Sequence, residues 1–95
     1  MSYPVTHFIR PYGRHVEIIM THIHQKDADW LASHKVKVSM EDTHAGMLVY
    51  ADYGKQTEDG EPDEHTLFVK AGETCFDAME RLVNELTPKV EKLNG

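Results

Sequence analysis

The segment that decides the fold is residues 74–93, which read TCFDAMERLVNELTPKVEKL. Its apolar residues recur at intervals of three and four, which is the spacing of one face of an α-helix. Thr74 is suited to cap this helix, with Asp77 three residues later as its capping-box partner. Pro88 is expected to kink the helix, or to restart it with Thr87 as a new N-cap. The buried stripe predicted from the spacing comprises Phe76, Met79, Leu82, Val83, Leu86, Val90 and Leu93.

The residues before this helix show the alternation that is typical of β-strands. Residues 35–40 (KVKVSM) alternate between polar and apolar side chains, and residues 47–53 (MLVYADY) follow a polar turn that contains Asp42 and Gly46. This pattern predicts a β-hairpin. Residues 65–70 (HTLFVK) predict one more strand, which leads into the helix.

The first third of the chain predicts another hairpin and a short helix. Residues 5–9 and 14–24 are rich in β-branched side chains, and Pro11 and Gly13 between them signal a turn. Asp27 is the expected N-cap of a helix that continues to Ser33. The predicted order is therefore β-β-α-β-β-β-α, a single α+β domain spanning residues 1–95. An antiparallel sheet of four to five strands is expected, with the long C-terminal helix packed on one face.

The composition indicates a folded, acidic, water-soluble protein. The chain has 95 residues and a formal net charge of −6. No stretch approaches the ~20 apolar residues of a membrane span, and the first residues lack the pattern of a signal peptide. The lone cysteine cannot form an internal disulfide, so a cytoplasmic location is expected. No cofactor-binding motif is present, and no cofactor is expected.

Two histidines, His22 and His24, are separated by one residue at the end of a predicted strand. Positions i and i+2 of a strand point to the same face, so both imidazoles could reach one transition-metal ion. Such a site needs a third and usually a fourth ligand. The candidates are His15, Asp27, Asp29 and His65. The preferred interpretation is that the two histidines lie on a solvated strand end and tune its charge by protonation.

Cys75 occupies the first position of the C-terminal helix. A helix N-terminus lowers the pKa of a thiol, so Cys75 is a candidate reactive thiol of a sensor or enzyme. The alternative is a small apolar residue that packs under the helix end.

The longest predicted loop, residues 54–64 (GKQTEDGEPDE), is strongly acidic. It lacks the residue order of a calcium-binding loop, and it is too long for a simple hairpin connection. It is either a solvated loop or a docking surface for a basic partner. Lys35 and Lys37 on the exposed sheet face form a second candidate surface. The acidic candidates for partner binding are Glu58, Asp59, Glu61, Asp63 and Glu64.

Residues 27–93 are predicted to follow the order α-β-β-β-α, which is similar to that of the double-stranded-RNA-binding domain. That family places a lysine cluster at the start of its last helix, where this chain reads Glu73-Thr74-Cys75-Phe76-Asp77. The missing lysines and the acidic net charge make nucleic-acid binding an unexpected function.

Together these patterns favour a small non-enzymatic protein that binds another protein with a basic surface, and self-association is a further expectation. Chains of this size and charge are common among accessory, inhibitor and regulatory proteins of bacteria and phages, which is an analogy. Two alternatives stay open: metal binding through His22 and His24, and thiol chemistry at Cys75.

Overall fold

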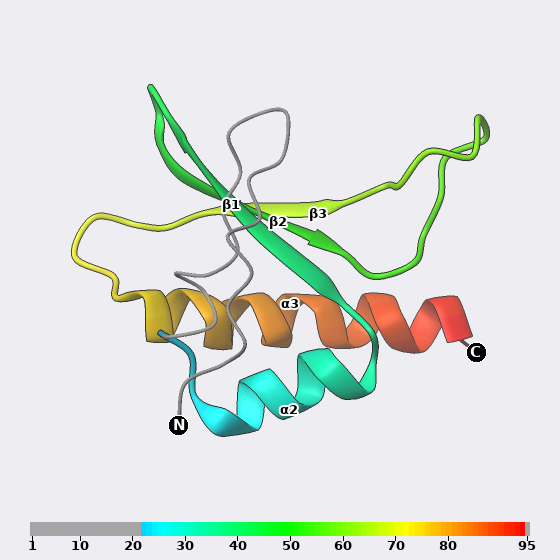
Figure 1. Ribbon diagram of the computed structural model, residues 1–95, viewed down its shortest axis with the longest axis horizontal. Helices are drawn as coiled ribbons and strands as arrows, with labels where there is room; N and C mark the ends of the chain where they lie inside the picture. The colour runs from blue at the N-terminus through cyan, green and yellow to red at the C-terminus, as the bar shows by residue number, and fades with distance from the viewer. Residues whose placement is uncertain (1–21, 95) are drawn as a thin grey trace.

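The computed structural model describes residues 22–94, which form a three-stranded sheet with two helices on one of its faces (Figure 1). A short helix comes first, three strands follow, and a long helix ends the described chain. The elements are α2 (Gln25–Ser33), β1 (Lys37–Thr43), β2 (Gly46–Asp52), β3 (His65–Phe68) and α3 (Cys75–Asn94). The predicted α+β class and the order α-β-β-β-α are confirmed for this part of the chain.

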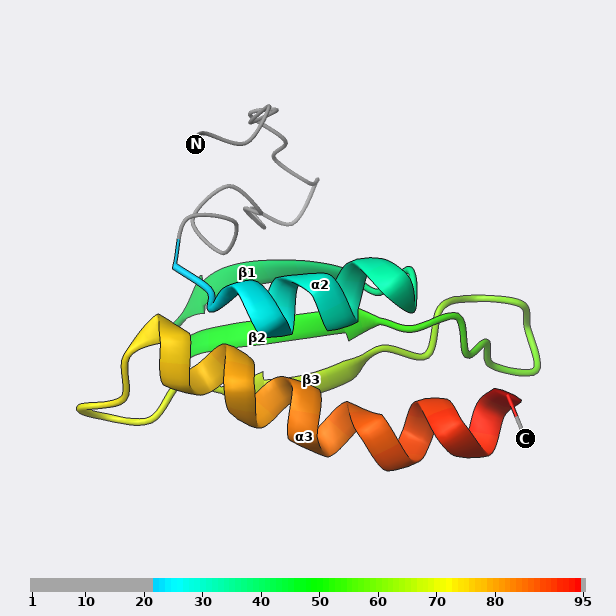
Figure 2. The ribbon, with the colours of Figure 1, turned by 90° about the horizontal axis from the view of Figure 1, so that it is seen from below.

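The sheet is antiparallel, and its strands are neighbours in the order β1-β2-β3. Met40 on β1 lies opposite Val49 on β2, which in turn lies opposite Leu67 on β3. These three side chains are buried on the face that the helices cover. Figure 2 shows α2 and α3 side by side against that face.

One hydrophobic core lies between the sheet and the helices. Helix α3 contributes the largest share, because one face of this helix is buried from Ala78 to Val90. Helix α2 contributes Leu31, and Trp30 is half-buried beside the core. The buried apolar residues are Leu31, Met40, Val49, Ala51, Tyr53, Leu67, Ala78, Met79, Leu82, Val83, Leu86 and Val90.

Helix α3 confirms the capped start and excludes one of the two expectations for Pro88, the restart of the helix. The N–H of Asp77 donates to the Thr74 hydroxyl at 3.1 Å, which is the predicted N-cap. The helix then runs through Pro88 to Asn94 as one element, so the predicted restart is wrong. Pro88 has no N–H to donate, and the hydroxyl of the preceding Thr87 donates to the Val83 carbonyl at 2.7 Å.

The two ends of the predicted apolar stripe are also corrected. The side chains of Phe76 and Leu93 are 36% and 46% exposed. Both residues lie in the terminal turns of α3, which the sheet covers only in part (Figure 2). Apolar spacing alone cannot show where the covering layer stops.

The β1–β2 hairpin forms with a tighter turn than the sequence predicts. Strand β1 continues to Thr43, so Asp42 belongs to the strand and not to the turn. The Thr43 hydroxyl donates to the carbonyl of Gly46 at 2.7 Å and accepts the N–H of Ala45 at 3.2 Å. Gly46 has a φ of 125°, which is readily adopted only by glycine.

Helix α2 begins one turn earlier than predicted, which corrects the role of Asp27. His24 is the N-cap, and its carbonyl accepts the N–H groups of Asp27 and Ala28, both at 3.0 Å. Asp27 lies inside the first turn and is only 4% exposed. Residues 22–24 form a bend and not the end of a strand. The rest of the hairpin predicted for residues 5–24 lies outside the described residues, within which the sheet has three strands.

No helix within residues 22–94 is both long enough and apolar enough to cross a membrane.

Candidate functional site

Residues 54–64 form an arm that projects from one end of the sheet, between β2 and β3 (Figure 1). Backbone hydrogen bonds close it upon itself. The N–H of Asp63 donates to the Lys55 carbonyl at 2.8 Å, and that of Thr57 donates to the Glu61 carbonyl at 2.8 Å. Gln56 and Pro62 form a β-bridge between these bonds. The predicted loop is therefore an ordered hairpin-like projection, which we call the arm.

The arm displays its carboxylates at its tip. Glu58, Asp59 and Glu61 are exposed around Gly60, whose positive φ of 84° allows the tight turn. The N–H of Gly60 donates to the Thr57 carbonyl at 2.9 Å and holds that turn closed. The ordering therefore comes from the backbone, and the three tip side chains are exposed to solvent on a turn that backbone hydrogen bonds close.

At the base of the arm the acidic residues behave differently. Asp63 forms an ion pair with Lys55 at 3.3 Å, with side chains 46% and 51% exposed. Glu64 is half-buried next to β3. Of the five predicted acidic residues, the structure thus places three at the tip and two at the base.

The predicted lysines lie at the same end of the sheet as the arm. Lys37 at the start of β1 is paired in register with Asp52, which is two residues before Gly54 at the base of the arm. Lys35 was predicted on the exposed sheet face, but β1 begins at Lys37 and Lys35 is exposed in the turn after α2. Its φ is 56°, and its N–H donates to the Ala32 carbonyl at 3.1 Å. This end of the molecule therefore carries both signs of charge.

The predicted histidine pair lies at the opposite end, against the start of α3. The ring centroids of His22 and His24 are 6.1 Å and 4.9 Å from that of Phe76. Among residues 22–94 no three His, Cys, Asp or Glu side chains are grouped so as to hold a metal ion. The candidate ligand His15 lies outside these residues, so the metal site stays a prediction.

Three other candidate ligands have different partners or surroundings. Asp29 accepts a hydrogen bond from the Gln25 amide at 2.8 Å. Asp27 is buried, and its Oδ2 atom has no hydrogen-bond partner among residues 22–94. His65 lies on β3, where it contacts Glu85 and Lys89 of α3 at 2.8 Å and 2.9 Å.

Cys75 is the first residue of α3, as predicted, and its side chain is partly buried. Burial raises the pKa of the Cys75 thiol above its usual value, because it disfavours the charged thiolate. This direction is opposite to the one that a reactive thiol requires. Reactivity of Cys75 remains untested, but its surroundings favour a packing role.

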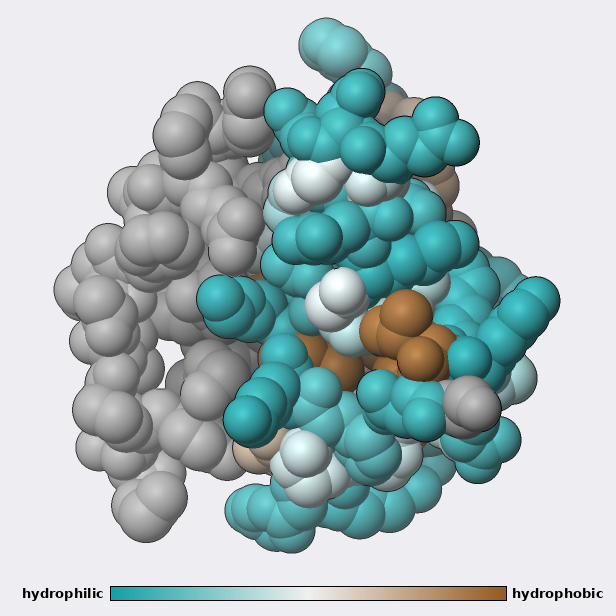
Figure 3. All heavy atoms as spheres, turned by 90° about the vertical axis from the view of Figure 1, so that its right-hand side faces the viewer, coloured by the Kyte–Doolittle hydropathy of each residue, from teal (hydrophilic) through white to brown (hydrophobic). Residues whose placement is uncertain are grey.

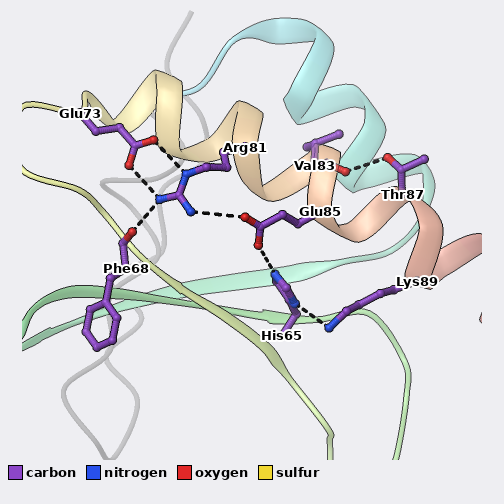
Figure 4. A network of polar contacts seen from close by, with 8 residues as sticks. All are labelled: His65, Phe68, Glu73, Arg81, Val83, Glu85, Thr87 and Lys89. Carbon is purple, nitrogen blue, oxygen red and sulfur yellow. Dashed lines mark hydrogen bonds and ion pairs between the residues drawn. The ribbon is translucent and has the colours of Figure 1, made fainter.

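A polar network between β3 and α3 was not predicted from the sequence (Figure 4). Arg81 donates to both carboxylate oxygens of Glu73 at 2.9 Å and 3.1 Å, and to the Phe68 carbonyl at 2.6 Å. It also contacts Glu85 at 3.3 Å. The Arg81 guanidinium, together with the N–H of Lys70, lowers the pKa of Glu73 to about 2. We call this group the seam network, because it fastens β3 to α3.

His65 extends the seam network along α3, and its contacts define its tautomer. The Lys89 ammonium can only donate, so Nδ1 of His65 must accept the hydrogen bond at 2.9 Å. Nε2 then carries the proton and donates to Glu85 at 2.8 Å. The His65 side chain is only 11% exposed.

The sequence contains one signal of the seam network, the i,i+4 spacing of Arg81 and Glu85. The contacts from α3 to Glu73, Phe68 and His65 span a turn and a separate strand, and no local pattern reveals them.

Comparisons with protein-family models, curated proteins and solved structures gave no match to this chain. Its function is therefore inferred from the residues and contacts described above.

Proposed function

We propose that this chain is a small acidic protein-binding domain, of the accessory or inhibitor kind, which docks its arm onto a basic surface of another protein. The observation that carries the proposal is that the arm is ordered although its tip is exposed. Backbone hydrogen bonds within the arm fix the turn, while Glu58, Asp59 and Glu61 face solvent. A turn of fixed shape loses little conformational entropy when it binds, which favours recognition.

Electrostatics support a basic partner. The arm has five acidic residues against one lysine, and the whole chain has a net charge of −6. Charges on an exposed projection attract an oppositely charged surface and raise the rate of association, more than they raise the final affinity. Binding through the arm should therefore weaken as the salt concentration rises.

The lysines beside the arm complete the proposed interface. Lys35 and Lys37 are exposed at the same end of the sheet. A partner that offers basic residues to the arm and acidic residues to these lysines would be held in one orientation, because like charges brought together cost free energy. A second copy of this chain carries both kinds of charge, so self-association is an outcome that the experiment has to distinguish.

The test is affinity capture from an extract of the native host, with identification of the captured proteins by mass spectrometry. The tip variant Glu58→Gln/Asp59→Asn/Glu61→Gln removes three charges and keeps the backbone of the arm. The matched control Asp42→Asn/Asp77→Asn/Glu91→Gln removes three charges from exposed positions outside the arm. The partner found with the unaltered chain is then purified, and its dissociation constant is measured against all three proteins.

We expect the tip variant to bind the basic partner with a dissociation constant at least tenfold higher than that of the unaltered chain. The control variant should bind nearly as the unaltered chain does. Equal binding by the tip variant and the control would contradict a role for the arm. If the capture recovers only further copies of this chain, and the tip variant abolishes that capture, the partner is a second copy of the chain and not a different protein.

A further inference from the structure

A basic pocket lies beside the base of the arm, where β2 ends and the last turns of α3 pass. Its volume is about 410 Å³, and it is lined by Tyr53, Lys55, Lys89, Lys92 and Leu93. A volume of this order suits a small organic molecule. Figure 3 looks onto this end of the protein and shows a small hydrophobic area enclosed by hydrophilic side chains. Of the five residues that line the pocket, only Lys55 belongs to the arm.

Three lysines line this pocket on a protein whose net charge is −6. Lys55 forms an ion pair with Asp63 at 3.3 Å, and the Lys89 ammonium donates to Nδ1 of the His65 ring at 2.9 Å. Lys92 forms no ion pair or hydrogen bond with the described residues. The pocket therefore keeps more positive charge than its immediate partners neutralise, which favours an anion.

The other two lining residues add a hydrogen-bond donor and an apolar wall. Tyr53 is largely buried, and its hydroxyl makes no hydrogen bond within the described residues. Leu93 is 46% exposed beside the lysines. A ligand with an apolar portion would cover Leu93 and the Tyr53 ring, which adds a hydrophobic contribution to the charge attraction.

We propose that this pocket binds a phosphate monoester whose organic portion is apolar or aromatic. Lysine ammonium groups bind phosphate as mobile point charges, and a dianion gains more than a monocarboxylate from several of them. The carboxyl-terminal end of the α3 dipole opposes an anion with roughly half an elementary charge. Lys89 and Lys92, which form no ion pair with a carboxylate of the described residues, together carry more charge than this. This site is separate from the acidic tip of the arm and does not depend on the proposed partner.

The experiment is a titration of the 15N-labelled protein with phenyl phosphate, followed by amide chemical shifts at constant ionic strength. We expect saturable shifts centred on Gly54, Lys55, Lys92 and Leu93, with a dissociation constant in the millimolar range that is usual for so small a ligand. Inorganic phosphate should bind at least fivefold more weakly, because it leaves Leu93 uncovered. Benzyl alcohol, which lacks the charge, should produce no saturable shift at these residues.

Three variants separate the parts of the proposal. Lys92→Gln should raise the dissociation constant of phenyl phosphate about fivefold, which is the effect of one exposed charge pair. Leu93→Ala should weaken phenyl phosphate and leave inorganic phosphate unchanged. Lys70→Gln removes the same charge from a position outside the pocket and should bind as the unaltered chain does.

Equal weakening by Lys92→Gln and Lys70→Gln would show a general charge effect and overturn the pocket. Equal affinity for phenyl phosphate and inorganic phosphate would contradict the proposal that the apolar portion of the ligand contributes to binding. Shifts spread over the whole surface, or no shift at the pocket residues, would overturn the site itself. The tip variant of the arm should bind phenyl phosphate normally, so the two proposals fail independently.

Discussion

The seam network and the arm both consist mainly of charged side chains, yet the two regions use them in opposite ways. In the seam, Glu73 is 13% exposed and is held by Arg81 through both carboxylate oxygens. In the arm, the backbone provides the order and the tip carboxylates face solvent. Charged groups in the seam are held by partners within the fold, whereas those at the tip of the arm are exposed to solvent.

The same contrast separates what a substitution should do in each region. A charge that is partly buried and satisfied by several partners leaves those partners unsatisfied when it is removed. When a charge on an exposed turn is removed, no buried partner loses its hydrogen bonds. Stability measurements can therefore test the division between the two regions without knowledge of the partner.

The largest effect is expected from Arg81→Met, which removes the centre of the seam network. Glu73 would lose its hydrogen-bond partner while only 13% exposed, and the Phe68 carbonyl would lose the donor at 2.6 Å. We expect the free energy of unfolding to fall by about 2–3 kcal/mol, measured by urea denaturation at pH 7.

The control for Arg81→Met is Lys26→Met, which also removes one positive charge and one ion pair, here between Lys26 of α2 and Glu80 of α3. Lys26 contacts Glu80 at 2.6 Å, but the two side chains are 66% and 42% exposed. Its effect should be much smaller, because solvent screens such a pair. Equal losses in the two variants would contradict the distinction between the seam and the exposed surface.

A smaller effect is expected from acid, again through Glu73. Its pKa is lowered from the usual 4.5 to about 2 by hydrogen bonds from Arg81 and from the N–H of Lys70. The unfolded chain therefore binds this proton at a higher pH than the folded chain. The resulting stability is fully present above about pH 4.5 and is lost as the pH falls toward 2.

This contribution should amount to roughly 1–2 kcal/mol, after allowance for solvent screening near the surface. It is measured as the difference between Glu73→Gln and the unaltered chain, in urea denaturation from pH 6 to pH 2.5. The two curves should converge at low pH. A constant difference over the whole range would show that Glu73 is not the titrating group.

The smallest effect on stability is expected from the tip variant Glu58→Gln/Asp59→Asn/Glu61→Gln. Because these side chains are exposed and the backbone holds the turn, the free energy of unfolding should change by no more than about 0.5 kcal/mol. Thermal and urea denaturation would measure it. A loss comparable to that of Arg81→Met would show that the arm is part of the stability of the fold.

Much of the fold follows from local sequence patterns. The helix from Thr74 and the β1–β2 hairpin were predicted because apolar spacing and a capping residue are both local features. The wrong predictions concern segments whose local pattern is compatible with two structures. Residues 22–24 read as a strand, but the carbonyl of His24 accepts the first helical hydrogen bonds instead. Asp27 resembles an N-cap, yet it is buried inside the first turn.

The candidate site was predictable in composition but not in form. The acidic residues of the arm and the lysines beside it could be named from the sequence. That the arm is closed by backbone bonds, or that Lys55 meets Lys89 and Lys92 around one pocket, depends on contacts between β2, α3 and the arm. Such contacts join distant positions, and only the folded arrangement brings them together.

The position of the arm has a consequence for how this protein can change. The arm leaves and re-enters the body between two neighbouring strands, and the Gln56–Pro62 bridge closes it beyond the sheet. Lengthening such a closed connection is inexpensive, at about 0.6 kcal/mol for each doubling. Insertions at Gly60, where no atom of the described residues lies within 4 Å of an added Cβ, would leave the core intact. The arm is thus a place where sequence and length can change while the residues that determine the fold stay constant.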